Sequence, residues 1–170
     1  MGVYLSRNSD CNMRAYCDSD WATCPDSRRS VSGYLVLLGD SPISWKSKKQ
    51  ETISLSSAEA EYRSLRKVVG ELVWLQRLII ELTIPHPSPI AVYCDSQAAI
   101  HIAHNPVFHE RTKHIEVDCH FVRDKLQEGL ISIQHVPTNE QFADIFTKSL
   151  NGVKHAAVLN KLVVRSLPPT

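Results

Sequence analysis

The chain has 170 residues, which is enough for one domain with a hydrophobic core and too few for two domains to be expected. Hydrophobic residues make up 43% and charged residues 22%, as is usual for a soluble globular protein. The net charge of +1 excludes binding to nucleic acid through a general basic field, so such binding would need local clusters. Five scattered cysteines without zinc-finger spacing indicate reduced intracellular thiols. Because no long apolar run is present, we expect neither a membrane span nor a signal peptide.

Three extended runs are predicted first, at residues 14–22, 31–38 and 42–46. Turn-forming residues separate them, TCPDSRRS in the first gap and GDS in the second, which favours an antiparallel meander. A long helix is predicted over residues 56–82, and Ser56 with Glu59 has the form of a capping box at its start. Its apolar residues recur at steps of three and four, as one buried face requires: Leu65, Val68, Leu72, Leu75 and Ile79.

The second half of the chain alternates between strands and helices. We expect strands at residues 90–94 and 130–136, and helices at 96–103, 113–127 and 139–150. This order predicts an α/β fold with one mixed sheet flanked by helices, and ligands at the carboxyl ends of its strands. We expect the domain to cover residues 1–151, and the extension over 152–170 to be partly helical and then disordered.

Four acidic residues stand out by position: Asp18 in an apolar strand, Glu61 early in the long helix, Asp95 directly before a helix and Asp144 in the last helix. Glu61 shares the apolar stripe of its helix, where a carboxylate is costly unless a cation compensates it. Glu59 lies instead on a polar face with Arg63 and Arg66. Hard divalent cations prefer clustered carboxylates, and two such ions about 4 Å apart suit in-line phosphoryl displacement.

Each acidic residue also has a purely structural interpretation. Glu61 could reach solvent from the edge of its stripe, and Asp95 could be a helix N-cap. Asp18 could pair with a nearby arginine, and Asp144 could be a solvated helix residue. Spacing alone does not show that the four converge. It also leaves Asp20 as a rival to Asp18, because both lie on the same face of their strand.

The chain resembles the RNase H domain of copia-type LTR retrotransposon polyproteins over nearly its whole length. The segments that carry the resemblance occur in order: YCDSDWATCPDSRRSVSGY, PISWKSKKQETISLSSAEAEYRSL, VYCDSQAAIHIAHNPVFHERTKHI and QHVPTNEQFADIFTKSL. Cellular and retroviral relatives look similar only at short points, which correspond to residues 17–19, 61–65 and 94–96.

The resemblance implies an RNase H-like fold, a five-stranded mixed sheet in the order 3-2-1-4-5. It implies a catalytic set of Asp18, Glu61, Asp95 and Asp144 that holds two Mg²⁺ ions, with Mn²⁺ as a substitute, and its motif favours Asp18 over Asp20. The implied activity is cleavage of the RNA strand of RNA–DNA hybrids during reverse transcription, which leaves 5′-phosphate and 3′-hydroxyl ends. The stretch HVPTNEQFAD has no room for the histidine loop of many relatives, so we expect slower turnover.

Basic residues form local clusters that could contact phosphates. By position and resemblance, the candidates are Arg28, Arg29, Lys48, Lys49, Arg111, Lys113 and His114. His101 and His104 have a spacing that could chelate zinc, but neither a C-x-x-C pair nor an HExxH motif accompanies them.

The resemblance also implies partners: an RNA–DNA hybrid and a reverse transcriptase domain of the same polyprotein, with no membrane. The implied location is the cytoplasm, within virus-like particles, or the nucleus. A different class of function stays open, a non-catalytic module that binds hybrids or serves as a polyprotein scaffold.

Overall fold

The computed structural model describes residues 2–3, 5, 10–105, 115–162 and 164–165. Five strands form one mixed sheet in the order β4-β3-β2-β5-β6. Their bounds are β2 Met13–Asp20, β3 Val31–Leu38, β4 Ser41–Lys49, β5 Ile90–Cys94 and β6 Ile131–His135. Counted along the chain, this is the order 3-2-1-4-5, as expected.

The sheet joins an antiparallel meander to two parallel strands. Strands β2, β3 and β4 pair antiparallel, while β5 runs parallel to both β2 and β6. The register places Cys17 of β2 beside Cys94 of β5. The carboxyl ends of β2 and β5 are therefore neighbours, which is where ligands bind in sheets of this kind.

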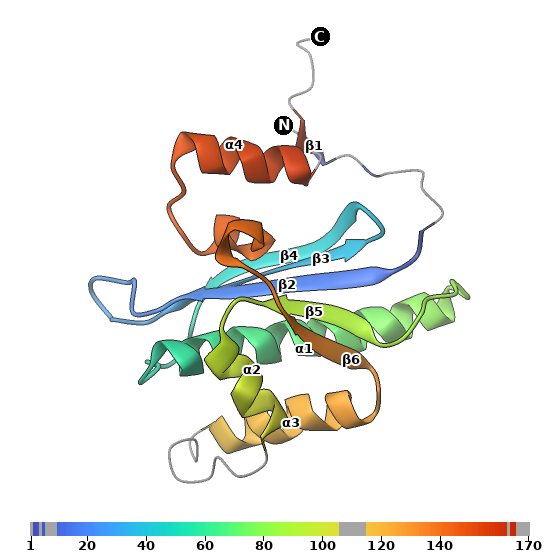
Figure 1. The fold of residues 1–170 in the computed structure, drawn as a ribbon, viewed down its shortest axis with the longest axis horizontal. Coiled ribbons are helices and arrows are strands. Elements are labelled where there is room, and N and C mark those ends of the chain that lie inside the picture. The colour runs from blue at the N-terminus through green and yellow to red at the C-terminus, as the bar shows by residue number, and fades with distance from the viewer. Residues whose placement is uncertain (1, 4, 6–9, 106–114, 163, 166–170) are drawn as a thin grey trace.

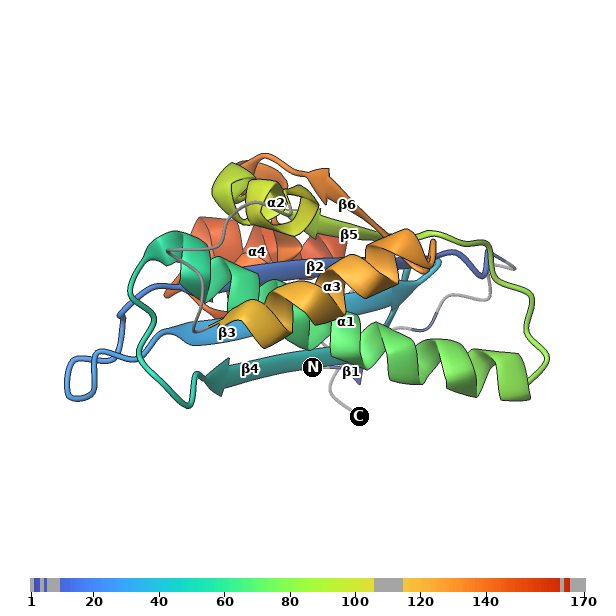
Figure 2. The same cartoon turned by 90° about the horizontal axis from the view of Figure 1, so that it is seen from below.

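Helices cover both faces of the sheet (Figure 1). One face carries α1 (Ser57–Glu81), α2 (Gln97–His104) and α3 (Glu116–Gln127). Figure 2 shows this face, with α1 lying along the sheet and α3 beside it. The other face carries the 3₁₀ helix η3 (Phe142–Phe146) and the helix α4 (Gly152–Lys161).

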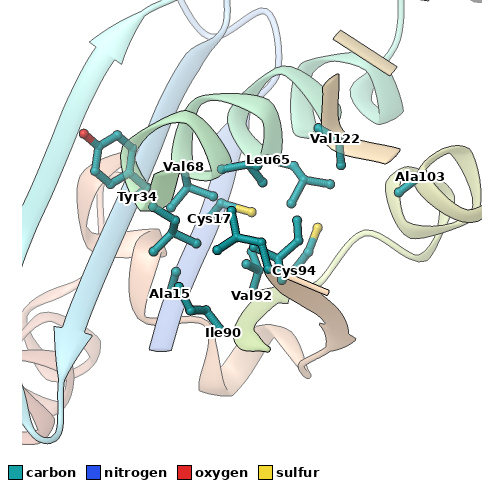
Figure 3. Close-up of a cluster of buried hydrophobic side chains, with 14 of the residues drawn as sticks. Ala15, Cys17, Tyr34, Leu65, Val68, Ile90, Val92, Cys94, Ala103 and Val122 are labelled. Atoms are coloured by element: carbon teal, nitrogen blue, oxygen red, sulfur yellow. The ribbon is translucent and has the colours of Figure 1, made fainter. Parts of the chain in front are cut away.

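The main core lies between the sheet and α1 (Figure 3). All five apolar stripe residues of α1 are buried, so the predicted helix phase is confirmed. From the sheet, Ala15 and Cys17 of β2 and Val92 and Cys94 of β5 pack against this stripe. A smaller core on the opposite face contains Tyr16, Leu35, Leu37, Ala143 and Leu162. Alternation along the strands thus divides their side chains between two layers.

The predicted helix at 139–150 is wrong. The chain there forms η2 (Thr138–Glu140) and then η3, both 3₁₀ helices. Gln141 explains the interruption: its side-chain oxygen accepts from the Ala143 N–H, and its amide donates to the Cys17 carbonyl at 3.0 Å. These contacts tie the segment to β2 in place of a regular helical turn.

Two further segments lie at the ends of the described chain. Helix α4 packs on the smaller core through Val158, and Leu162 directly after it is buried there. Strand β7 (Val164–Arg165) pairs antiparallel with β1 (Gly2–Val3), a pairing that the sequence pattern did not predict. Within the described ranges, no helix is both long and apolar enough to cross a bilayer.

Candidate active site

Asp18 lies near the carboxyl end of β2, and its side chain is fully buried. Its carboxylate accepts a hydrogen bond from the Thr147 hydroxyl and lies 3.0 Å from the Lys148 Nζ. The structural alternative, a pair with a nearby arginine, is not what the structure shows: the cation beside Asp18 is Lys148, which follows η3. Asp18 joins other acidic residues in a group close enough to share an ion, whereas Asp20 belongs to no such group among the described residues.

Glu61 lies in the second turn of α1 and is only 8% exposed. Its Oε1 accepts a hydrogen bond from the Ser19 N–H at 3.1 Å, while its buried Oε2 has no hydrogen-bond partner among the described residues. Burial first, and then electrostatic interaction with Asp18, Cys94 and Asp95, raise the pKa of Glu61 to about 10. The interpretation that Glu61 reaches solvent is wrong, and among the residues that the structure describes no cation forms an ion pair with this carboxylate.

Asp95 follows β5 directly, but it is not the N-cap of α2 that its position suggested. The N-cap of α2 is Ser96, whose side chain accepts from the Ala99 N–H. The Asp95 carboxylate instead accepts a hydrogen bond from the Thr138 hydroxyl at 3.1 Å. The Asp95 carboxylate is therefore not used to cap α2, and it can take part in binding a cation at the end of β5.

Asp144 lies in η3 and is 9% exposed, so the solvated interpretation is wrong as well. Its Oδ1 is 2.7 Å from the Lys148 Nζ. Burial raises the pKa of Asp144, although the hydrogen bond from Lys148 opposes the shift. Because η3 packs across β2 and β3, this carboxylate reaches the end of β2 from the opposite face to Glu61.

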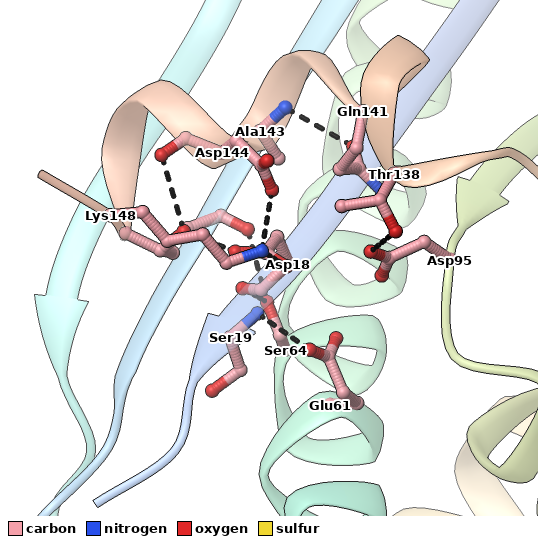
Figure 4. A network of polar contacts seen from close by, with 12 residues as sticks. Asp18, Ser19, Glu61, Ser64, Asp95, Thr138, Gln141, Ala143, Asp144 and Lys148 are labelled. Carbon is pink, nitrogen blue, oxygen red and sulfur yellow. Dashed lines mark hydrogen bonds and ion pairs between the residues drawn. The ribbon is translucent and has the colours of Figure 1, made fainter. Parts of the chain in front are cut away.

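The four predicted residues converge (Figure 4). Asp18, Asp95 and Asp144 each offer an oxygen, and these atoms lie within 4.8 Å of one another. Glu61 and Asp95 form a second group with the Cys94 sulfur, within the same limit. Asp95 belongs to both groups, so it can bridge two cations. Clustered oxygens of this kind are the ligands that hard divalent cations prefer.

Lys148 is the residue that the sequence interpretation missed. It contacts both Asp18 and Asp144, and these carboxylates raise its pKa although burial alone would lower it. The available signal was its spacing: Lys148 follows Asp144 by four residues, and an oppositely charged pair at that distance can meet within one turn. Cys94 was likewise taken only as one of five scattered, reduced thiols.

Glu59 lies beside Arg63, as the predicted polar face requires, but it is buried. Its Oε1 pairs with Arg63 at 2.7 Å, and its Oε2 accepts from the Leu55 N–H. Ser56 accepts from the Glu59 N–H, so the capping role of Glu59 is confirmed in slightly altered form.

The basic candidates are only partly described. Arg28 and Arg29 are exposed in the turn between β2 and β3, and Lys48 and Lys49 are exposed at the end of β4. The register pairs Val31 with both Asp20 and Lys49, so these cations lie at the sheet end that carries Asp18. Three further candidates lie outside the described residues: Arg111, Lys113 and His114.

Solved structures establish the class of fold. The chain superposes on LC11-RNase H1, isolated from compost, with a TM-score of 0.60 over 81% of this chain and 93% of that one, at 14% identity. The N-terminal RNase H domain of a Mycobacterium tuberculosis protein gives a TM-score of 0.56 over 88% of this chain and 97% of that one, also at 14% identity. No protein-family model matches the chain. The chain therefore has the RNase H fold.

Curated proteins of similar sequence give a more specific relationship than the fold alone. The chain is 43% identical over 169 residues to the retrovirus-related Pol polyprotein from transposon RE2 of Arabidopsis thaliana, and 41% identical over the same length to that of transposon RE1. Over 140 residues it is 40% identical to the polyprotein from transposon TNT 1-94 of Nicotiana tabacum. These matches cover 99%, 99% and 82% of the chain. The predicted resemblance is confirmed: the chain is homologous to one segment of copia-type Pol polyproteins, about an eighth (12%) of the length of the first two.

Proposed function

We propose that the chain is a metal-dependent ribonuclease H that cleaves the RNA strand of RNA–DNA hybrids. The observation that carries this proposal is the meeting of Asp18, Asp95 and Asp144 within 4.8 Å, with Glu61 adjoining through Asp95. A structural neighbour, LC11-RNase H1, has been solved in complex with an RNA/DNA hybrid, at a TM-score of 0.57 and 15% identity over 80% of this chain and 94% of that one. The polyprotein relatives suggest a reverse transcriptase domain as the partner in the same polyprotein.

The residues present fit divalent metal ions. Within the described part of the chain, Glu61 keeps a buried oxygen without a hydrogen-bond partner, and burial of an uncompensated carboxylate is unfavourable. Asp18, Asp95 and Asp144 would hold one Mg²⁺, and Glu61 with Asp95 would hold part of a second. Such ions supply a water of lowered pKa and stabilise the charge on the leaving 3′ oxygen.

The chain's own contribution is to hold these carboxylates in place before substrate arrives. Thr147 orients the Asp18 carboxylate and Thr138 orients that of Asp95, each by a hydroxyl hydrogen bond. The Ser19 N–H fixes one oxygen of Glu61. Ligands locked by neighbouring hydrogen bonds lose little freedom when metal binds. The exposed cations at the same end of the sheet would position the phosphate backbone.

One observation favours the alternative, a hybrid-binding module without catalysis. The Lys148 ammonium already lies between Asp18 and Asp144, and it neutralises part of the charge that a metal ion would neutralise. Lys148 is 33% exposed on its side chain, so it has room to withdraw toward solvent. The two functions therefore differ in whether Mg²⁺ displaces this contact.

A cleavage assay decides between them. The purified chain is incubated with hybrid labelled on its RNA strand, with Mg²⁺ or with EDTA, and with matched RNA and DNA duplexes as controls. We expect cleavage of the hybrid only, in Mg²⁺ only, with 5′-phosphate ends. Binding of hybrid without cleavage in Mg²⁺ or Mn²⁺ would contradict the enzymatic proposal and support the binding module.

Three variants test the residues. Asp95→Asn and Glu61→Gln should each lose cleavage by orders of magnitude, because each removes a charged ligand. Asp95→Asn should keep its fold, since Ser96 and not Asp95 caps α2. Glu59→Gln is the matched control: it should cleave normally but lose about 3 kcal/mol of stability, because its ion pair with Arg63 is buried. Equal loss of cleavage in both glutamate variants would contradict the assignment of Glu61.

A further inference from the structure

Cys94 belongs to the buried core, but its sulfur also lies close to carboxylate oxygens of Glu61 and Asp95. Strand alternation points Cys94, like Val92, toward α1, which is the helix that carries Glu61. Asp95 follows at the end of the strand. One carboxylate oxygen of Glu61, one of Asp95 and the Cys94 Sγ lie within 4.8 Å of one another.

The second observation concerns Glu61 alone. The residue is 8% exposed, its Oε1 accepts a hydrogen bond from the Ser19 N–H, and its Oε2 is buried with no hydrogen-bond partner in the ranges that the structure describes. In Figure 4 the side chain extends from α1 toward Asp18 and Asp95. A buried carboxylate oxygen without a hydrogen bond is stabilised when it binds a cation or a proton. One of the neighbouring atoms that could bind the same cation is the Cys94 sulfur.

The chemistry of this donor set differs from that of the all-oxygen group. A thiolate with two carboxylates suits a soft or borderline ion such as Zn²⁺ or Cd²⁺, whereas Mg²⁺ avoids sulfur. Zinc–sulfur bonds of about 2.3 Å and zinc–oxygen bonds of about 2.0–2.2 Å place ligand atoms closer together than the 4.8 Å limit, so the side chains would have to close around the ion when it binds. The Cys94 proton would leave to solvent on binding.

We propose that Glu61, Cys94 and Asp95 form a site for a thiophilic divalent cation, of the zinc and cadmium class, beside the all-carboxylate group. This group shares Asp95 with the all-carboxylate group and contains both residues that would hold part of the second Mg²⁺, so a thiophilic ion here would compete with Mg²⁺. The site depends on geometry and not on hybrid cleavage, so it stands or falls separately from the proposed activity.

The test uses the full reduced chain, stripped of metal and titrated with Cd²⁺ alone. Thiolate-to-cadmium charge transfer absorbs in the ultraviolet and reports sulfur coordination directly. We expect this band to grow to saturation with the parent and to be lost in Cys94→Ala. Cys119→Ala is the matched control: Cys119 is equally buried in the same core, but it lies on α3 beside Tyr62, and its removal should leave the band unchanged.

Two carboxylate variants complete the test. Glu61→Gln and Asp95→Asn should keep the band but weaken Cd²⁺ binding at least about tenfold each. Asp95 is not part of the core, so its variant remains informative if Cys94→Ala does not fold, which a thermal melt without metal reveals. An unchanged band in Cys94→Ala, or unchanged Cd²⁺ affinity in both carboxylate variants, would overturn the proposal. If the chain does not cleave hybrid but gives the expected Cd²⁺ titrations, the proposed thiophilic site is still supported.

Discussion

The ammonium group of Lys148 lies 3.0 Å from the carboxylate of Asp18, a fully buried side chain at the end of β2. The same ammonium lies 2.7 Å from Asp144. An internal cation thus joins two of the carboxylates to which we assign a metal ion. In the metal-free protein this contact reduces the repulsion among buried like charges.

Replacement of Lys148 by Met should therefore destabilise the metal-free protein but strengthen its binding of Mg²⁺. Without metal, the unfolding free energy should fall by about 2 kcal/mol, between the values for exposed and buried pairs, because the side chain is one-third exposed (33%). Mg²⁺ affinity should rise, because no ammonium has to be displaced. Thermal melts in EDTA and calorimetric Mg²⁺ titration measure the two effects.

Lys154→Met is the control for this variant, since Lys154 is an exposed residue of α4. It should leave both quantities unchanged. A Lys148→Met protein that binds Mg²⁺ more weakly than the parent would show that Lys148 supports the metal site and does not compete with it.

The raised pKa of Glu61 predicts how pH acts on the metal-free protein. Its ordinary pKa of 4.5 applies in the unfolded chain, and burial with nearby negative charge raises it to about 10 in the folded one. The folded protein thus binds a proton that the unfolded chain releases. Glu61 contributes most to stability below pH 4.5, and this contribution is lost as pH rises toward 10.

Glu61→Gln should remove this dependence. In EDTA, the melting temperature of the parent should decline relative to that of Glu61→Gln between about pH 5 and about pH 9. Saturating Mg²⁺ should reduce the decline, because metal favours the ionised carboxylate. Parallel melting profiles of the two proteins across this range in EDTA would contradict the raised pKa.

Gly33 allows η3 to approach the sheet beside Asp18, with which it pairs in the register of β2 and β3. A Cβ on Gly33 would lie 2.7 Å from Thr147 Cγ2 and 2.8 Å from Phe146 Cβ. Gly33→Ala should therefore displace η3, which carries Asp144. We expect a loss of about 1–3 kcal/mol in unfolding free energy and weaker Mg²⁺ binding.

The control for Gly33→Ala is Gly152→Ala, at the first position of α4, where an added Cβ meets nothing within 4 Å. It should leave Mg²⁺ binding unchanged, and its stability should be equal or slightly higher. Equal Mg²⁺ affinity of Gly33→Ala and the parent would show that the position of η3 does not depend on this close approach.

The exposed cations predict the salt dependence of hybrid binding. Each phosphate contact contributes about 0.7–0.9 to the slope of log affinity against log salt. Replacing Arg28 and Arg29 together by Ala should reduce this slope by about one to two contacts, measured by fluorescence anisotropy in EDTA so that cleavage does not interfere. We predict the same for Arg111 with Lys113. If the slope is unchanged in one of the double variants, the two residues replaced in that variant do not contact phosphates of the hybrid.

The sequence by itself determined the order of the five strands of the main sheet and of α1, α2 and α3, and it determined which face of α1 is buried. Periods of two and of three to four residues appear in any strand or helix with one buried face, so the meander and the phase of α1 could be read locally. The phase also placed Glu61 on the buried face, because a helix repeat fixes which residues share a side. The likeness to copia-type polyproteins selected the same four acidic residues.

Only the tertiary structure decided what those residues contact. Convergence of Asp18, Asp95 and Asp144 depends on strand neighbours and on η3 folding back over β2, and neither follows from local spacing. The same holds for the capping of α2 by Ser96, which releases Asp95, and for the burial of Glu59 against Arg63. Lys148 and Cys94 acquire their significance from side chains that lie 130 and 33 residues away in the chain, Asp18 and Glu61, so the physical reason is long-range packing.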